Sequence, residues 1–139
     1  MENHRSDATL LTQNLIRIDS TDPGAYEKNI AEYIFKQLSS LSVPVIKKEV
    51  LPGRYNIMAK IKGEIDDPAL VYICHMDTVT IGDGWTTDPL GAEVINGRIY
   101  GRGACDMKSG LACALPAFPA MAEEAPSGRI PSHAYVYIG

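Results

Sequence analysis

A continuous run of apolar and aromatic residues, from Leu70 to Cys74, constrains the fold of this chain more than any other feature. A short run rich in β-branched and aromatic side chains is typical of a buried strand. Strands that are apolar on both faces belong to the interior of a largely parallel sheet covered by helices on both sides. The sequence therefore predicts an α/β fold with three layers, in which a mixed sheet lies between helices.

Two polar residues directly follow this predicted strand. His75 and Asp77 are separated by one residue, so both side chains lie on one face if the chain stays extended. A carboxylate can accept a hydrogen bond from one imidazole N–H, which fixes the tautomer and leaves the other ring nitrogen for a metal ion. A buried histidine satisfied by a turn aspartate explains the same pattern, and for His-x-Asp alone this structural explanation is the commoner one.

A second polar cluster, Asp106 to Lys108, follows the glycine-rich turn 101–104. Glycine permits the tight turn, and the segment 107–124 that comes next has helical character. Asp106 therefore fits an ordinary helix N-cap, although Ser109 is not the Glu or Gln that a capping box requires. In the functional alternative, its carboxylate extends toward His75 at the carboxyl edge of the sheet, where open α/β sheets usually place their sites.

Both clusters and the connection between them resemble the signature of one family, that of zinc aminoacylases, acetylornithine deacetylases, succinyl-diaminopimelate desuccinylases and glutamate carboxypeptidases. The matching features are His75-x-Asp77, Trp85 with Asp88-Pro89, the stretch 96–104 and Asp106-Met107-Lys108. Weaker similarity extends from Leu10 to Gly139. Two motifs in the right order, joined by a matching connection, are more specific than either motif alone.

The resemblance implies metal-dependent hydrolysis of an amide bond through a metal-activated water. The substrate would be a small N-acyl amino acid, which is deacylated, or a peptide cleaved near its terminus. The implied cofactor is zinc, as two ions that cobalt or manganese can replace. In that site Asp106 would bridge the two ions, His75 would bind one of them, and Asp77 would be the catalytic residue that holds His75.

The resemblance also implies that residues 1–139 are the amino-terminal portion of a dinuclear-metal hydrolase catalytic domain. In the family, a strand corresponding to the last one here runs into a Glu-Glu pair that supplies the general base and a metal ligand. Further ligands and a lid or dimerisation domain follow, and the sequence holds none of these. Because zinc takes about four ligands, we expect the isolated chain to be inactive. The alternative is a truncated, non-catalytic remnant that acts as a binding or interaction module.

Composition argues against several other classes of partner. The net charge is −4 and the basic residues are dispersed, which argues against nucleic acid. No apolar stretch is long enough for a signal peptide or a bilayer span. The three cysteines, at positions 74, 105 and 113, are odd in number and lack a Cys-x-x-Cys spacing, so we expect reduced thiols and a cytoplasmic protein.

The remaining pattern predicts the framework around the two clusters. Apolar spacing predicts helices over 7–18 and around 30–41, and alternation predicts strands over 45–50 and 56–61. Pro116 and Pro119 are expected to end or kink the helix after Asp106.

Four further expectations concern the ends of these elements. We expect a polar turn over 63–67, a solvated Glu123-Glu124 pair, and His133 at a surface or edge position. The strand that starts near His133 is expected to lie at an open sheet edge, which favours a homo-oligomer.

Overall fold

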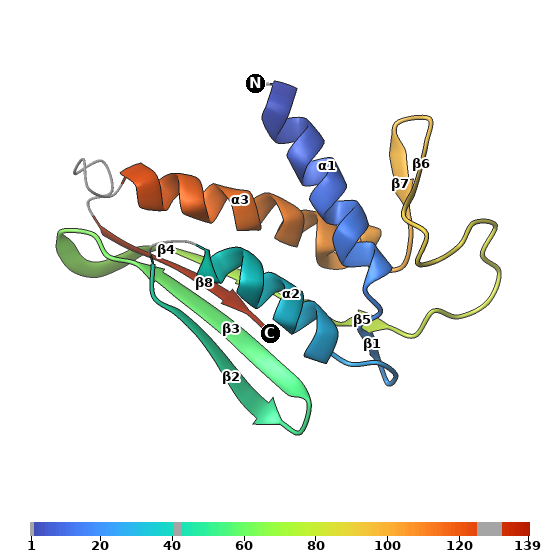
Figure 1. Ribbon diagram of the computed structural model, residues 1–139, viewed down its shortest axis with the longest axis horizontal. Coiled ribbons are helices and arrows are strands. Elements are labelled where there is room, and N and C mark those ends of the chain that lie inside the picture. Colours follow the sequence, from blue (N-terminus) through green and yellow to red (C-terminus); the bar gives the residue numbers. More distant parts are fainter. Residues whose placement is uncertain (1, 41–42, 125–131) are drawn as a thin grey trace.

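The computed structural model describes residues 2–40, 43–124 and 132–139, and its centre is a four-stranded sheet (Figure 1). The strand order is β2 (Val45–Leu51), β3 (Arg54–Ile61), β8 (Ser132–Ile138) and β4 (Ile65–Cys74). β3 runs antiparallel to both β2 and β8, whereas β4 runs parallel to β8. The sheet is therefore mixed, and the predicted α/β class is confirmed.

The position of β8 corrects one prediction. The last strand is not at an edge, because it pairs with β3 on one side and with β4 on the other. Ile138 lies opposite Ile57 of β3, and Val136 lies opposite Tyr72 of β4. The edges of the described sheet are β2 and β4 instead. The homo-oligomer was predicted from an exposed final strand, so the structure removes the reason for that prediction.

Helices α1 (Glu2–Arg17), α2 (Lys28–Ser39) and α3 (Ser109–Glu124) cover one face of the sheet (Figure 1). The covered face is formed by alternate strand residues, as the pleat requires. Together with apolar residues of the helices they form one core; its fully buried members include Leu15, Ile30, Ile34, Leu111, Phe118, Ile57, Val136 and Ile138. A second helical layer is not among the described residues and stays a prediction.

The other face of β4 differs from the prediction of a strand buried on both sides. Ile73 is 72% exposed and Val71 is 51% exposed, whereas Cys74 is buried against the helices. The apolar composition was identified correctly, but only one of the two faces has a cover in the described part of the chain. Strand β4 also begins at Ile65, inside the segment predicted as a turn.

Two small two-stranded sheets lie beside the main one. β1 (Thr21–Asp22) pairs in parallel with β5 (Thr78–Val79). β6 (Glu93–Ile95) and β7 (Arg98–Tyr100) form a hairpin that projects from the body of the molecule (Figure 1). Its turn residues Asn96 and Gly97 both have positive φ values, 51° and 76°. This is the Asn-Gly chemistry that a tight two-residue hairpin needs.

Helix α3 is continuous from Ser109 to Glu124 although Pro116 and Pro119 lie inside it. The predicted early end is therefore wrong. Leu115 and Phe118, each next to one of the prolines, are buried in the core. Tertiary packing of this apolar face overrides the local cost of proline.

Three other expectations have clear outcomes. Glu123 and Glu124 are exposed, as predicted. His133 is 3% exposed and its Nδ1 accepts a hydrogen bond from the Gly63 backbone at 3.0 Å, so the predicted surface position is wrong. The strand places this side chain under the turn that leads into β4. No helix in the described part of the chain has the length and apolarity needed to cross a membrane.

Candidate metal centre

The loop that follows β4 carries His75 and Asp77 at the carboxyl end of the parallel strands. Its backbone is fixed on both sides: Met76 N–H donates to Gly139 O at 2.8 Å, and the Ser20 hydroxyl donates to Met76 O at 2.7 Å. The Met76 side chain is fully buried. An anchored apolar residue between two outward-facing polar residues holds both of them in a defined place.

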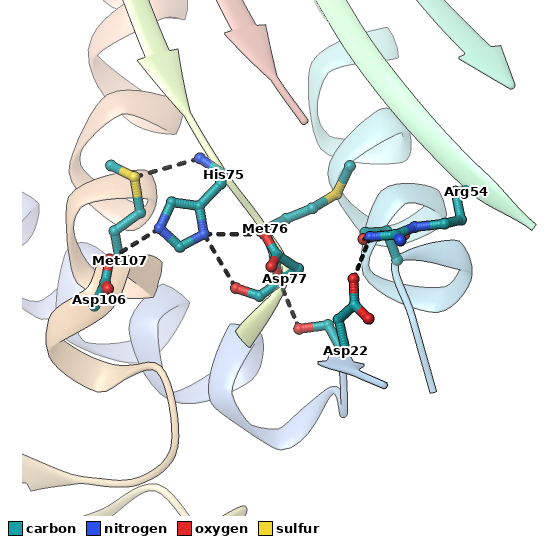
Figure 2. A network of polar contacts seen from close by, with 9 residues as sticks. Asp22, Arg54, His75, Met76, Asp77, Asp106 and Met107 are labelled. Carbon is teal, nitrogen blue, oxygen red and sulfur yellow. Dashed lines mark hydrogen bonds and ion pairs between the residues drawn. The ribbon is translucent and has the colours of Figure 1, made fainter. Parts of the chain in front are cut away.

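His75 lies between two carboxylates (Figure 2). Its Nδ1 is 3.1 Å from Asp77 Oδ1 and 3.1 Å from the Asp77 carbonyl oxygen, and its Nε2 is 2.9 Å from Asp106 Oδ1. Partial burial lowers the pKa of His75, but the hydrogen bonds to Asp106 and Asp77 outweigh it, so the pKa lies above its ordinary value of 6.5. The structure thus brings together the three residues singled out from the sequence.

Asp106 is presented by a π-helical turn, Ala104–Lys108, that precedes α3. It does not directly precede the helix as an N-cap would, because Met107 after it is also non-helical, with φ and ψ of −129° and 32°, and α3 begins only at Ser109. The side chain of Asp106 is 87% exposed. Met107 Sδ accepts a hydrogen bond from the His75 backbone N–H at 3.3 Å, which joins this turn to the loop after β4.

Gly103 allows the turn to approach the loop after β4 closely. Its φ is +79°, and a Cβ at this position would lie 2.6 Å from Thr78 Cγ2 and 3.2 Å from Lys108 Cδ. Real Cβ atoms do not come so near to another carbon, and L-residues disfavour this backbone conformation. Glycine is therefore required for Asp106 to reach His75.

Lys108 belongs to the cluster 106–108 named from the sequence, but the sequence did not predict its burial or assign it a role. It is 1% exposed, and its Nζ donates to Ile18 O at 2.8 Å, just past the end of α1. Burial lowers its pKa to about 8, and the charge of Asp19 opposes this shift only in part. A cation is favoured near a helix carboxyl end, so Lys108 ties the Asp106 turn to α1.

A cavity of about 240 Å³ opens over these residues. It is lined by His75, Asp77, Thr78, Val79 and residues 101–106. Carboxylate side chains and the His75 imidazole therefore border a space large enough for part of a small molecule. This is the chemistry that binds a divalent metal ion and the polar end of a substrate.

Another group of charged residues, Asp22, Glu27 and Arg54, lies on the other side of Asp77 and was not predicted. Arg54 donates from Nε to Glu27 Oε2 at 2.8 Å, contacts Glu27 Oε1 through Nη2, and lies 2.8 Å from Asp22 Oδ2 (Figure 2). Glu27 is 4% exposed, so its charge is compensated inside the protein. Asp22 belongs to β1, which pairs with the strand that begins directly after Asp77. Arg54 is remote in sequence from Asp22 and Glu27, and the three residues match no short motif.

The residues present fit part of a metal site. His75 Nε2 and the Asp106 carboxylate are suitable donors 2.9 Å apart, and Asp77 holds the other ring nitrogen in the manner usual for a ligating histidine. Within residues 2–40, 43–124 and 132–139, no group of three or more His, Cys, Asp or Glu side chains is close enough to hold a metal ion. Among the described residues, His75 and Asp106 are therefore a pair of candidate donors, which is fewer than zinc takes.

Comparison with known proteins gives matches to one group of enzymes. The model for peptidase family M20/M25/M40 matches residues 71–131. A succinyl-diaminopimelate desuccinylase of Methylobacterium radiotolerans is 39% identical over 121 residues, which is 84% of this chain and 30% of the relative. A Bacillus subtilis N-formyl-4-amino-5-aminomethyl-2-methylpyrimidine deformylase is 32% identical over 120 residues, 83% of this chain and 28% of the relative. The chain thus spans less than a third of these relatives' length.

Solved structures share the fold. Human carnosine dipeptidase 1 matches with a TM-score of 0.75 at 20% identity, over 99% of this chain and 32% of that one. An M20 family metallo-carboxypeptidase of Sulfolobus solfataricus matches with a TM-score of 0.76 at 19% identity, over 95% and 30% of the two chains. A Bacillus subtilis dinuclear metal binding peptidase of the M20 family matches at 0.68 with 12% identity, over 99% and 35%.

Proposed function

This chain belongs to peptidase family M20/M25/M40, and from that premise we propose that it is the amino-terminal portion of the catalytic domain of a metal-dependent amide hydrolase. The observation that carries the proposal is the placement of His75 between Asp77 and Asp106 at the mouth of a cavity. Two of these residues are donors for a metal ion, and the third orients the imidazole.

Each residue has a distinct role in this proposal. Both oxygens of Asp77 near Nδ1 are acceptors, so Nδ1 carries a proton. Nε2 faces Asp106 Oδ1 at 2.9 Å and would bind the metal ion after losing its own proton. The Asp106 carboxylate has two oxygens and is the group suited to contact two zinc ions, or cobalt or manganese in their place. When bound, such ions polarise a carbonyl group and lower the pKa of a water molecule to about 7.

The proposed substrate is a small N-acyl amino acid or a peptide. The relatives named above include a succinyl-diaminopimelate desuccinylase and a deformylase of an N-formyl compound, and these names support an N-acyl substrate. The remaining metal donors and the general base are proposed to come from polypeptide outside these 139 residues. We therefore expect no turnover by the isolated chain. A cytoplasmic location is part of the proposal and is supported by the odd number of cysteines and the lack of a Cys-x-x-Cys spacing.

The test is to express the chain with the coding sequence that continues it in the source DNA, and to measure amine release from N-succinyl and N-acetyl amino acids in the presence of zinc. Replacing His75 by Ala or Asp106 by Asn should reduce turnover by at least about 10³-fold. Arg98→Gln, on the exposed hairpin, is the matched control and should retain it. Turnover that survives both replacements and a chelator would contradict the proposal.

A non-catalytic binding module is the second candidate, and the observation that favours it is the set of only two metal donors in the described residues. This candidate predicts that no continuing sequence restores hydrolysis. It also predicts a stable partner of the isolated chain, either a second copy or another protein, which light scattering would detect as a mass above that of the monomer. A monomer that becomes active when extended would exclude it.

A further inference from the structure

The segment from Ile18 to Ser20, directly after α1, is hydrogen-bonded to both parts of the chain that carry the candidate metal donors. The Ile18 carbonyl accepts a hydrogen bond from Lys108 Nζ, in the Asp106 turn, at 2.8 Å. The Ser20 hydroxyl donates to Met76 O, in the loop after β4, at 2.7 Å. These two parts are remote in sequence from each other and from the segment that joins them.

The segment is itself buried and fixed in place. Ser20 is 1% exposed, and its backbone carbonyl accepts a hydrogen bond from Thr78 N–H at 3.0 Å. Thr21, the next residue, lies opposite Thr78 in the parallel pair of β1 and β5 (Figure 1). The Thr21 backbone N–H also donates to Asp19 Oδ1 at 3.0 Å. A segment fixed by strand pairing can hold neighbouring groups in a defined place.

Asp106 depends on support from outside its own side chain. That side chain is 87% exposed, so packing around it contributes little to its position. Lys108, two residues later, is 1% exposed, and its backbone N–H donates to Gly103 O at 2.9 Å. The backbone of Lys108 thus closes the turn, while its ammonium group fixes the turn to Ile18.

His75 depends on the same segment through its neighbour. Met76 is fully buried, and the Ser20 hydroxyl holds its carbonyl group. The distance of 2.9 Å between His75 Nε2 and Asp106 Oδ1 is therefore set against one common support. A metal ion needs such precision, because its ligands must be held close to their final geometry by the residues behind them.

We propose that Ser20 and Lys108 are positioning residues of the metal centre, which set the separation of its two donors through the segment 18–20. The inference rests on the proposed function, since it assigns a role to residues that support His75 and Asp106. It extends the centre to a segment that contributes no donor. Neither positioning residue contacts the metal ion or the substrate in this scheme.

The first measurement uses the isolated, metal-free chain. The nuclear Overhauser effect between the His75 ring protons and the Asp106 β protons reports the distance between the two donors. Ser20→Ala and Lys108→Met should each weaken this signal several-fold, relative to a signal within the His75 ring.

Thr12→Val is the matched control for the loss of a buried hydroxyl group. Thr12 is 4% exposed, and its hydroxyl donates to Ala8 O at 2.7 Å within α1, the same distance as in the Ser20 contact. This variant should keep the signal between His75 and Asp106 unchanged, even at the same cost in stability as Ser20→Ala.

The second measurement is Mn²⁺ binding by the isolated chain at pH 7, followed by line broadening of the His75 signals. Lys108→Met removes a positive charge close to the site, so electrostatics alone predicts tighter binding of the cation. Positioning predicts the opposite, a loss of affinity of about tenfold, as when a group that orients a metal ligand is removed. Ser20→Ala changes no charge and should also lose affinity.

Several outcomes would overturn the proposal. These are an undiminished signal in Ser20→Ala and Lys108→Met, its absence from the unaltered chain, an equal loss in Thr12→Val, and tighter Mn²⁺ binding by Lys108→Met. If Lys108→Met does not fold, the comparison of Ser20→Ala with Thr12→Val still decides. If His75→Ala binds Mn²⁺ as well as the unaltered chain, the donor assignment in the proposed function fails, and the metal-free measurement decides on the positioning independently.

Discussion

Two charged clusters flank Asp77, and they differ in how completely their groups are partnered. In the first, which we call the closed cluster, Arg54 binds buried Glu27 and Asp22, so the cation faces two carboxylates. In the second, the open cluster, His75 bridges Asp77 and an Asp106 side chain that is 87% exposed. Both clusters border a cavity, of about 200 Å³ at the closed cluster and about 240 Å³ at the open cluster. The charges of the closed cluster are paired with one another, whereas the Asp106 carboxylate of the open cluster is largely exposed.

The difference separates two uses of charge. The closed cluster joins β1, α2 and β3 and thereby supports the strand pairing next to Asp77. The open cluster rests on a buried cation, Lys108, whose direct contact is a backbone carbonyl and not a carboxylate. We infer that the closed cluster stabilises the fold, whereas the open cluster holds groups ready for chemistry at some cost in stability.

The largest expected effect concerns Lys108. Its pKa is about 8 in the folded protein against an ordinary value of 10.5, so between these values the unfolded chain binds more protons than the folded one. The free energy of unfolding should therefore rise with pH across that window, by about 3 kcal/mol. Urea denaturation at pH 8 and pH 10 measures it. Lys108→Met should lack the rise, and a variant with the same pH profile as the unaltered chain would contradict the assignment.

The next effect contrasts one carboxylate from each cluster. Glu27→Gln removes a buried charge that faces Arg54 and should lower the free energy of unfolding by about 2 kcal/mol. Asp106→Asn changes an exposed side chain and should alter it by less than about 0.5 kcal/mol. Thermal and urea denaturation give both values. Equal losses in the two variants would remove the distinction between the clusters.

The same pair of variants should act in the opposite order on the pKa of His75. Asp106→Asn removes the strongest of the contacts that raise this pKa, so the pKa should fall. Glu27→Gln does not touch His75 and should leave its pKa where it is. An NMR titration of the imidazole protons in the metal-free chain reports both. No shift in Asp106→Asn would mean that the contact is absent in solution.

The smallest expected effect concerns the ion pair of Lys47 and Glu32 at the surface, with which both clusters can be compared. Lys47 lowers the pKa of Glu32 through a hydrogen bond and its charge. A lowered carboxyl pKa contributes stability above the ordinary value of 4.5, and this contribution is lost as pH falls through the folded pKa. Lys47→Met should make the acid side of the stability profile slightly flatter. A larger change than that caused by Glu27→Gln would be inconsistent with a partly exposed surface pair.

Much of the open cluster could be predicted from the sequence because its signals are local. The one-residue spacing of His75 and Asp77 predicts that their side chains share a face of the strand. The glycines before Asp106 predict a tight turn. The burial of Lys108 was missed because it depends on the approach of Gly103 to Thr78, which no sequence spacing encodes. Gly103 was the available signal, since a residue that tolerates φ of +79° marks a place where another group comes close.

The closed cluster and the strand order could not be predicted in the same way. Glu27 and Arg54 are in contact only because α2 packs beside β3. The sequence of neither segment indicates that the two elements are neighbours. The apolar run 70–74 indicated a strand correctly, but burial on each face depends on which elements cover it. The mistaken edge position of the last strand has the same cause, because neighbours in a sheet need not be neighbours in sequence.

The interior position of β8 has a consequence for how the molecule forms. β2 and β3 are joined by a short turn and can pair early, whereas β4 finds its place in the main sheet through β8. Ile57 can pair with Ile138 only after the last strand has been synthesised. Cys74 pairs with the same residue from the strand on the other side of β8. Contacts between such distant segments carry a high entropic cost before they stabilise anything. During synthesis, the loop that bears His75 would therefore gain its hydrogen bond to Gly139 only after the strand 132–138 has left the ribosome.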